Sequence, residues 1–299
     1  MSEEKEIVKI EEEQQYLNLI RTILLSGSLE EGRNGSVMSI FGSSMRFSLQ
    51  NGQIPILTSK KVAWKTCLKE LLWFISGSTD NQKLIDQKVH IWTGNGSREF
   101  LNSRGLEHLK ENDLGPVYGH QWRHFNAPYT NCSTDYTSQG IDQLQQIIDC
   151  LKDPVQRYSR RLVMSAWNPQ QLNEMALPPC HIVAQFNVSK GNKLSCLLYQ
   201  RSADVGLGMP FNIASYAFLT HILAKHCGLE AYEFVYMAGN CHIYEEHIDP
   251  IKGQLDNELF PFPTIEIKTC HENINDYKME DIHVLNYKCN NAISMKMIV

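Results

Sequence analysis

The chain has 299 residues, with 28 lysines and arginines against 33 aspartates and glutamates and a formal charge of −5 at pH 7. Its hydrophobic content of 42% is enough to build a core without stabilising metals, and the acidic balance argues against general nucleic-acid binding. The sequence lacks an apolar run of membrane-spanning length and a signal-peptide core, and its nine scattered cysteines suit a reducing compartment, so a cytoplasmic protein is expected.

The first part of the chain predicts helices separated by glycine-marked loops. Residues 1–13 are rich in charge and are expected to form a flexible lead-in to a helix near residues 14–25. A loop containing Arg33 then precedes strand-like segments at 39–49. Residues 64–75 predict a helix that ends at Ser76-Gly77.

The middle of the chain begins irregularly and then becomes helical. Gly115-Pro116 and Gly119 are expected to break the chain around Tyr118, and residues 126–140 predict a polar surface loop. An apolar stripe over 141–151 predicts a helix that ends before Asp153-Pro154.

The remaining pattern predicts a hairpin and a buried helix. Apolar runs at 182–188 and 194–200 flank a short polar stretch, as in a β-hairpin, and 212–227 is almost continuously apolar. We find no internal repeat or low-complexity linker. The sequence therefore predicts one mixed α/β (α+β) domain over residues 14–299.

Cys180 is the most informative single residue. It follows Pro178-Pro179, which hold the chain extended, and directly precedes a strand-like run, so its thiol is expected at the mouth of a strand. Arg201 is a fixed cation twenty residues on, and a nearby cation lowers a thiol pKa and makes it nucleophilic. The alternative is that Cys180 merely fills space, as most free cysteines do.

Other candidate groups are one carboxylate and a pair of arginines. On a helical wheel Glu70 lies among Thr66, Cys67, Trp73 and Phe74, which predicts a raised pKa suited to proton transfer; the alternative is a surface contact with a lysine. Arg160-Arg161 precedes a strand-like run, and guanidinium groups bind phosphate with paired hydrogen bonds. Surface arginines are nevertheless often only solvated.

Metal and nucleotide-loop motifs are weak. Three Cys-His dipeptides occur, but adjacent residues on a strand diverge, and no Cys-x-x-Cys spacing supports zinc. A Gly-x-Gly-x-x-Gly or Walker-type loop is also missing from the sequence. We therefore expect no metal.

Several short strings identify a family when they are taken together. They are Glu70-Leu71-Leu72-Trp73-Phe74, Asp113-Leu114-Gly115-Pro116-Val117-Tyr118-Gly119, Arg160-Arg161 before Ser165-Ala166-Trp167-Asn168, Pro179-Cys180-His181, Gln200-Arg201-Ser202, Pro210-Phe211-Asn212-Ile213-Ala214-Ser215-Tyr216 and His242-Ile243-Tyr244. In this order they resemble the thymidylate synthases, in particular the eukaryotic and viral members. The resemblance runs over about residues 14–299. It implies the fold of that family, in which a large mixed sheet is flanked by helices and two sheets pack back to back in a homodimer.

The resemblance also implies the reaction. Members of the family are methyltransferases that convert dUMP to dTMP, with 5,10-methylenetetrahydrofolate supplying both the carbon and the hydride and leaving as dihydrofolate. Cys180 would be the thiolate that adds to the uracil ring, and the site would stabilise the resulting enolate. Glu70 would organise the water that moves protons. The further catalytic residues implied are Tyr118, His181, Asp204 and Asn212.

By the same resemblance, two sets of residues would bind the ligands. The dUMP contacts would be Arg33, Gln200, Arg201, Ser202, Asn212, His242 and Tyr244, with Arg160 and Arg161 reaching into the neighbouring subunit's site. The folate contacts would be Ile91, Trp92, Asn95, Asp204, Leu207, Gly208 and Phe211, and Val299 would close over the bound ligands. The amide of Asn212 would select uracil, because it offers both a donor and an acceptor.

The chain departs from the family pattern at four places. The loop after Arg33 is one residue short, Asn240 stands where aspartate is usual, Leu259-Phe260 replaces an arginine-containing stretch, and residues 288–291 replace Asn-Pro-His-Pro. Each departure leaves the central chemical groups in place.

Two other functions remain as alternatives. A folate-dependent deoxyuridylate hydroxymethylase of the same fold would use the same cysteine but let water quench the intermediate. A binding protein without catalysis, for example one that contacts RNA, would need a basic groove, which the acidic composition disfavours.

Overall fold

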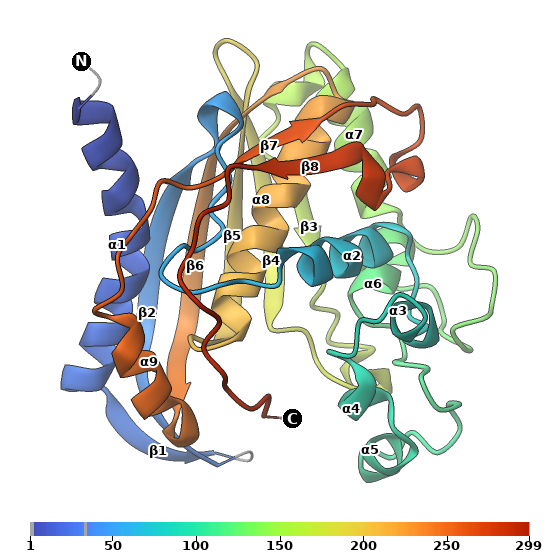
Figure 1. Cartoon of the computed structure of the whole chain (residues 1–299). Coiled ribbons are helices and arrows are strands. Elements are labelled where there is room, and N and C mark those ends of the chain that lie inside the picture. The colour runs from blue at the N-terminus through green and yellow to red at the C-terminus, as the bar shows by residue number, and fades with distance from the viewer. Residues whose placement is uncertain (1–2, 33–34, 299) are drawn as a thin grey trace.

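A six-stranded mixed sheet forms the centre of the computed structural model, which describes residues 3–32 and 35–298 and side chains from residue 12 onward (Figure 1). Its strands run in the order β1-β2-β6-β5-β4-β3, and β5 and β6 are its parallel pair. Their bounds are β1 (Ser28–Gly32), β2 (Gly35–Ser48), β3 (Val163–Ser165), β4 (His181–Ser189), β5 (Lys193–Asp204) and β6 (Glu230–Tyr244). A separate antiparallel pair consists of β7 (Thr264–Ile267) and β8 (Ile282–Leu285). The predicted mixed α/β class is confirmed.

Helices pack on the sheet and on one another. The α-helices are α1 (Glu3–Ser26), α2 (Trp64–Ile75), α3 (Gln82–Ile85), α4 (Thr93–Gly96), α5 (Arg98–Ser103), α6 (Tyr118–His124), α7 (Gln143–Lys152), α8 (Gly208–His226) and α9 (Ile248–Gln254). α8 lies against β5 and β6, α1 lies against β2, and α2 packs onto α8 (Figure 1). In the described ranges none of the helices is both long and apolar enough to cross a membrane.

The strongest sequence patterns fold as predicted. The helix over 64–75 has the predicted bounds, and Gly77 follows it with a φ of +74°. Strands β4 and β5 form the predicted hairpin, whose turn places Gly191 and Asn192 at positive φ. The continuously apolar run is α8, which is buried along nearly its whole length because the sheet lies on one side and α2 on the other.

Two boundaries differ from the prediction. The first helix begins at Glu3 instead of near residue 14, and at its centre the carboxylate of Glu13 is buried and accepts bonds from Thr58 and Ser59 at 2.6–2.9 Å. The chain is also helical, not broken, from Tyr118 onward, since α6 starts there. Gly119 lies inside α6, and glycine is required there because a Cβ at that position would lie 2.7 Å from the carbonyl oxygen of Ser78.

The two faces of the sheet have different surroundings. Tyr236 on β6 is fully buried toward α8, whereas Met237, its neighbour in sequence, points to the opposite face and is 40% exposed. On that outer face Phe41 of β2 is 85% exposed, beside a hollow of about 440 Å³ that Tyr199 also lines. The outer face therefore carries large uncovered apolar side chains.

Candidate active site

Cys180 directly precedes β4, at the mouth of a strand as predicted. The Arg201 guanidinium donates hydrogen bonds from Nη2 to the carbonyl oxygen of Pro178 at 3.0 Å and from Nε to that of Pro179 at 2.8 Å. Its Nη2 also lies 4.0 Å from Cys180 Sγ. The hairpin register brings them together, because the amide of Arg201 also donates to the Cys180 carbonyl at 2.9 Å. A β-bulge follows at His181, and it directs this end of the strand toward the site.

The electrostatic prediction for the thiol is only half right. The nearby guanidinium of Arg201 does act to lower the pKa of Cys180, as the sequence suggested. Burial is the larger effect, and in the single chain the pKa of the Cys180 thiol lies above its usual value. The predicted net lowering is therefore wrong, because desolvation of the thiolate outweighs the effect of one partly solvated cation.

Tyr118 and His181 form a stacked pair against the nucleophile. The phenol oxygen of Tyr118 accepts the backbone N–H of Cys180 at 2.8 Å, and the rings of Tyr118 and His181 stack at 4.0 Å. His181 Nδ1 lies 2.8 Å from the hydroxyl of Tyr216. Burial lowers the pKa of His181 to about 3, so this imidazole is neutral at pH 7 and orients its neighbours.

Glu70 is the buried carboxylate predicted from the helical wheel. Its side chain lies among aromatic residues, and Trp92 Nε1 donates to Oε1 at 2.7 Å. Burial raises the pKa of Glu70 to about 7, and the Trp92 bond opposes that shift. This confirms the raised pKa. A carboxyl group that titrates near neutral pH can both hold and release a proton.

The parallel ends of β5 and β6 bring further predicted residues together. Asp204 is paired with His242 in the strand register, and Ser202 with Asn240. His242 is 8% exposed and its Nδ1 is 2.8 Å from Asn240 Oδ1, so Asn240, one of the departures, orients this ring. The ring of Tyr244 meets that of His242 edge-on at 5.2 Å.

Gln200 is the member of this group that faces the core. Its side chain is 2% exposed, accepts from Tyr236 at 3.0 Å and donates to the carbonyl of Ser202 at 2.9 Å. These bonds fix the backbone beside Arg201.

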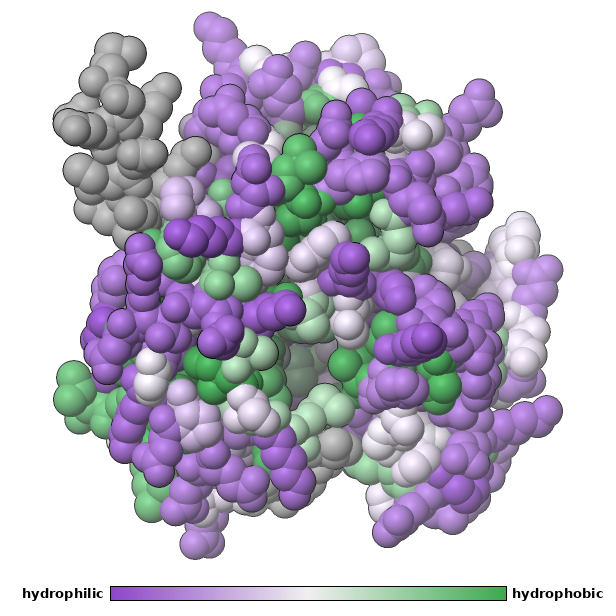
Figure 2. Space-filling model, in the orientation of Figure 1, coloured by the Kyte–Doolittle hydropathy of each residue, from purple (hydrophilic) through white to green (hydrophobic). Residues whose placement is uncertain are grey.

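The start of α8 supplies the remaining wall. Leu207, Gly208, Phe211 and Asn212 occupy its cap and first turns and are half-buried. On the other side Ile91 is half-buried, while Trp92 and Asn95 are 7% exposed. The molecule is hollowed in the middle of the face that Figure 2 presents, between the C-terminal segment and the region of α4, with apolar surface along the hollow. These side chains suit a flat aromatic ligand that needs apolar walls and a few polar contacts.

Some predicted residues lie apart from this group or outside the described ranges. Arg160 and Arg161 are exposed, and within the described ranges their guanidinium groups form no ion pair. Arg33 and Val299 lie outside the described residues. The described residues nearest to Arg33 are Gly32 and Gly35, which pair with each other in the β1–β2 ladder.

Two residues at the site had no role in the sequence prediction. Trp167 lies under Arg201, with its ring centre 5.4 Å from the guanidinium carbon, and so helps to fix the cation. Lys60 is buried and donates from Nζ to the carbonyl of Gly206, which follows Asp204 by two residues. Trp167 belongs to a matching string and could have been flagged, whereas nothing in the sequence around Lys60 predicts its burial.

Two departures from the family pattern meet in space. Lys288 Nζ lies 3.9 Å from the ring centre of Phe260, so the altered C-terminal stretch contacts the altered segment before β7. The amide of Asn290 donates to the carbonyls of Thr58 and Glu258 at 3.0 and 2.7 Å. The C-terminal segment is therefore attached where its sequence differs.

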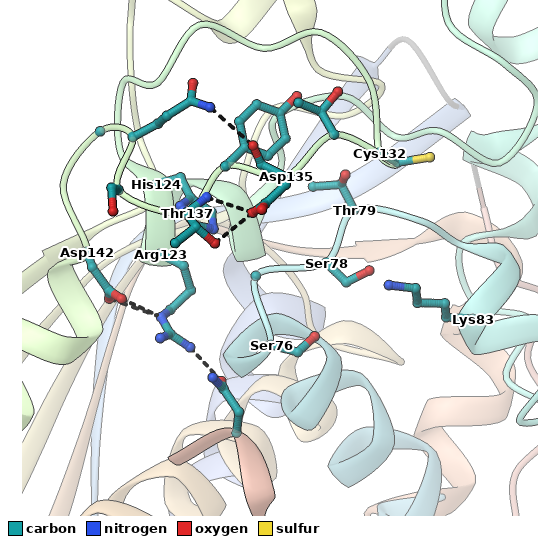
Figure 3. Close-up of a pocket in the computed structure, with 17 residues that line it drawn as sticks. Ser76, Ser78, Thr79, Lys83, Arg123, His124, Cys132, Asp135, Thr137 and Asp142 are labelled. Carbon is teal, nitrogen blue, oxygen red and sulfur yellow. Dashed lines mark hydrogen bonds and ion pairs between the residues drawn. The ribbon is translucent and has the colours of Figure 1, made fainter. Parts of the chain in front are cut away.

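A second, polar cavity of about 450 Å³ lies elsewhere, between the end of α2, the end of α6 and the loop over 132–142 (Figure 3). None of the predicted site residues lines it. Its carboxylates are engaged: Asp142 binds Arg123 at 3.0 Å, and Asp135 accepts from Thr137 at 2.6 Å. The free thiol of Cys132 also lines it, but burial and the nearby carboxylates of Asp113 and Asp80 raise the pKa of this thiol to about 11, so it is a weak nucleophile at neutral pH.

Within the described part of the chain, no cluster of three or more histidine, cysteine, aspartate or glutamate side chains is placed to hold a metal ion.

Comparison with known proteins relates the sequence of this chain to one family. The family model described as "Thymidylate synthase" matches residues 14–299. The chain is 48% identical over 301 residues to a thymidylate synthase of Saccharomyces cerevisiae, covering 97% of this chain and 98% of that protein. It is 49% identical over 288 residues to a thymidylate synthase of Equine herpesvirus 2, covering 96% and 98%.

Other relatives are longer. A bifunctional dihydrofolate reductase-thymidylate synthase of Paramecium tetraurelia is 50% identical over 289 residues, which are 96% of this chain and 62% of that protein. The chain thus spans about three-fifths of the length of this relative. None of these three relatives is named a hydroxymethylase, so that alternative gains no support from them.

Proposed function

This chain belongs to the thymidylate synthase family, and from that premise we propose that it catalyses the reductive methylation of dUMP to dTMP. The co-substrate is 5,10-methylenetetrahydrofolate, which supplies the one-carbon unit and the hydride and leaves as dihydrofolate. The observation that carries the proposal is the position of Cys180 at a strand mouth, 4.0 Å from the Arg201 guanidinium and bonded through its amide to Tyr118.

The nucleophilic step belongs to Cys180. Its thiolate adds to the pyrimidine ring, and the negative charge then moves to the ring oxygen. Arg201 favours the thiolate, and phosphate bound beside Arg201 and Ser202 would hold the nucleotide in line with the sulfur. Asn212 presents both an amide donor and an acceptor to the edge of the base.

Proton movement belongs to Glu70 and Tyr118. Because the pKa of Glu70 is about 7, this group can give a proton to an ordered water and take it back within one turnover. Tyr118 uses its oxygen to accept the Cys180 amide, so its own proton is free to face the ring. Both groups contact the aromatic cluster that lines the site, Glu70 through Trp92 and Tyr118 through Phe74.

The residues around the folate position fit a flat, partly apolar ligand. Leu207, Phe211 and Ile91 are half-buried apolar side chains around Trp92, and the carboxylate of Asp204 can accept from N–H groups of a pterin ring. Val299 is proposed to close this site.

We further propose that the protein is a homodimer formed through the outer face of the sheet. Phe41 is 85% exposed on that face beside Met237, and uncovered apolar surface of this kind marks an interface. In such a dimer the unpaired Arg160 and Arg161 would bind the phosphate in the partner's site and add cations near its Cys180. That addition would offset the burial that raises the thiol pKa. Separately, we propose that the protein is cytoplasmic.

The test is covalent capture. Incubation with fluoro-dUMP and methylenetetrahydrofolate should give a stable adduct at Cys180, seen by intact mass and peptide mapping, and Cys180→Ser should give none. With dUMP the product should have the mass of dTMP. A wild-type chain that forms no adduct would refute the proposal, and hydroxymethyl-dUMP as the product would replace it with the hydroxymethylase.

A further inference from the structure

His247 joins the C-terminal segment to the body of the protein. It lies in the turn after β6, its side chain is fully buried, and its Nε2 is 2.7 Å from the backbone carbonyl of Lys296. A carbonyl oxygen only accepts, so Nε2 carries the hydrogen and donates it. Between β8 and this point the segment has no regular secondary structure, so His247 is a fixed attachment close to its end (Figure 1).

The other ring nitrogen of His247 faces the carboxylate of Asp204, which is the proposed contact to the folate. Nδ1 is 4.0 Å from Asp204 Oδ1, is buried, and has no hydrogen-bond partner in the described ranges. Asp204 Oδ1 is itself taken by the amides of Gly206 and Leu207 at 2.8 and 3.3 Å. One imidazole therefore lies between the C-terminal segment and Asp204 and is hydrogen-bonded on the C-terminal side.

Gly206 shows how tightly these parts pack. A Cβ at this position would lie 3.0 Å from His247 Nδ1, 3.2 Å from Asp204 Oδ1 and 3.3 Å from the Met295 sulfur. The carbonyl of Gly206 is held from another direction by Lys60 Nζ. Three groups from separate segments thus converge on one backbone position without free space, and a shift of one must displace another.

We propose that His247 is a positioning residue that couples the C-terminal segment to the Asp204 carboxylate, so that binding at the folate position and docking of the C-terminal segment strengthen each other. The coupling is reciprocal: a docked segment raises folate affinity by the same factor by which folate favours docking. This inference rests on the proposed function, because it takes Asp204 to be a folate contact.

The variants separate the hydrogen bond from the bulk of the ring. His247→Phe keeps an aromatic ring but cannot donate to Lys296, whereas His247→Gln keeps an amide donor. His221→Phe is the matched control, since His221 is also a buried histidine whose Nε2 lies 2.9 Å from a backbone carbonyl, that of Gln53. All three are measured as the full chain, after thermal melts confirm that they are folded.

The readouts are hydrogen exchange of the peptide covering 288–298 and the dissociation constants of dUMP and of the dihydrofolate product, the latter in the presence of dUMP. His247→Phe should speed hydrogen exchange of that peptide and raise the dissociation constant of dihydrofolate about tenfold, while that of dUMP changes less than twofold. His247→Gln should recover at least half of both effects, and His221→Phe should show neither. In a chain shortened by residues 296–299, His247→Phe should have no further effect on dihydrofolate.

Three results would overturn the inference: unchanged exchange in a folded His247→Phe protein, equal losses for both ligands, or a full effect in the shortened chain. Failure of the proposed function is recognised separately. It appears as a wild-type protein that makes no dTMP, whereas the exchange of the unliganded variants does not depend on turnover.

Discussion

The phenol oxygen of Tyr118 accepts the backbone N–H of Cys180 at 2.8 Å, so the proposed nucleophile and a proposed proton carrier are joined directly. Burial holds the pKa of Tyr118 well above its usual value, and the phenol stays protonated at neutral pH. Its ring is fixed by stacking on His181 and by contact with Phe74 at 4.9 Å. The hydroxyl hydrogen is therefore available to a second acceptor in the site.

Tyr118→Phe removes that hydroxyl and leaves the Cys180 amide without its partner. We expect kcat to fall about 100-fold, the lower range for loss of a positioned proton-transfer group, and unfolding free energy to fall by about 1–3 kcal/mol. Steady-state assays of dTMP formation and urea unfolding measure the two effects. Tyr277→Phe, whose hydroxyl contacts Cys270 away from the site, is the control. A kcat within threefold of wild type would remove Tyr118 from the mechanism.

Local patterns in the sequence predicted much of this arrangement. The wheel around Glu70 gave its aromatic neighbours and raised pKa, because helix geometry fixes which side chains share a face. The prolines before Cys180 and the hairpin after it placed the thiol at a strand mouth.

Contacts between distant segments were not predictable. The thiol pKa depends on burial by segments far away in sequence, so reasoning from Arg201 alone gave the wrong direction. The role of His247 could not be predicted, because a single histidine near a strand end matches no sequence motif. Its hydrogen-bond partner, the carbonyl of Lys296, is 49 residues away in the chain. Residue 13 was placed in a flexible lead-in because its neighbours in sequence do not reveal the tertiary hydrogen bonds that hold its carboxylate to Thr58 and Ser59.

Glu70→Gln should change how stability depends on pH. The folded-state pKa is raised from 4.5 to about 7, so between these values the folded protein holds a proton that the unfolded chain has lost. Stability from this group is therefore greatest below pH 4.5 and falls as pH rises to 7, by a total on the order of 3 kcal/mol. Glutamine removes this fall, so urea unfolding should show the variant gaining on the wild type from pH 5 to pH 8. The exposed Glu266→Gln is the control, and a constant difference between Glu70→Gln and wild type would contradict the assignment.

Arg201→Gln tests the cation beside the thiol. Because the guanidinium lowers the pKa of Cys180 while burial raises it, loss of the cation leaves burial unopposed and the pKa should rise further. The pH profile of Cys180 alkylation by iodoacetamide, followed by peptide mass, should move to higher pH. Arg46→Gln, which breaks an exposed pair with Glu233, should not move it. An unchanged profile in Arg201→Gln would show that Arg201 does not tune the sulfur.

Phe41→Asp tests the proposed dimer. The side chain is 85% exposed in the single chain, so a charge there costs the protomer little, whereas at a back-to-back sheet interface it would be buried unpaired. Sedimentation should show a dimer for wild type and a monomer for Phe41→Asp. Val155→Asp, on a residue 79% exposed outside the sheet, is the comparison. A dimeric Phe41→Asp protein would place the interface elsewhere.

The dimer proposal makes a second demand on Arg161. If its guanidinium binds phosphate in the partner's site, Arg161→Ala should weaken the binding of dUMP by about tenfold or more, since a charge-assisted hydrogen bond contributes about 1.5–3 kcal/mol. Folate binding, measured with saturating nucleotide, should change less. Mixed dimers of Arg161→Ala and Cys180→Ala should regain activity, because one of their two sites would combine an intact cysteine with an intact arginine. Equal losses for both ligands, or no recovery on mixing, would count against donation between subunits.

Asn212→Asp tests the reading of the base. Asn212 lies in the second turn of α8, which begins at Gly208. Its Oδ1 points toward Gly208, since a Cβ built on that glycine would lie 3.8 Å from it. The amide is therefore presented at the first turn of the helix. Uracil offers an N–H and a carbonyl, which an amide matches, whereas the corresponding edge of cytosine offers an amino group and an unprotonated nitrogen. A carboxylate accepts from the amino group and repels the uracil carbonyl.

The ratio of kcat/KM for dCMP to that for dUMP should therefore rise at least tenfold in Asn212→Asp, mostly through loss of dUMP activity. The control is Asn187→Asp on the exposed part of β4, which should leave this ratio unchanged. If the ratio stays at the wild-type value in Asn212→Asp, the residue does not read the base and selection must come from the backbone around it.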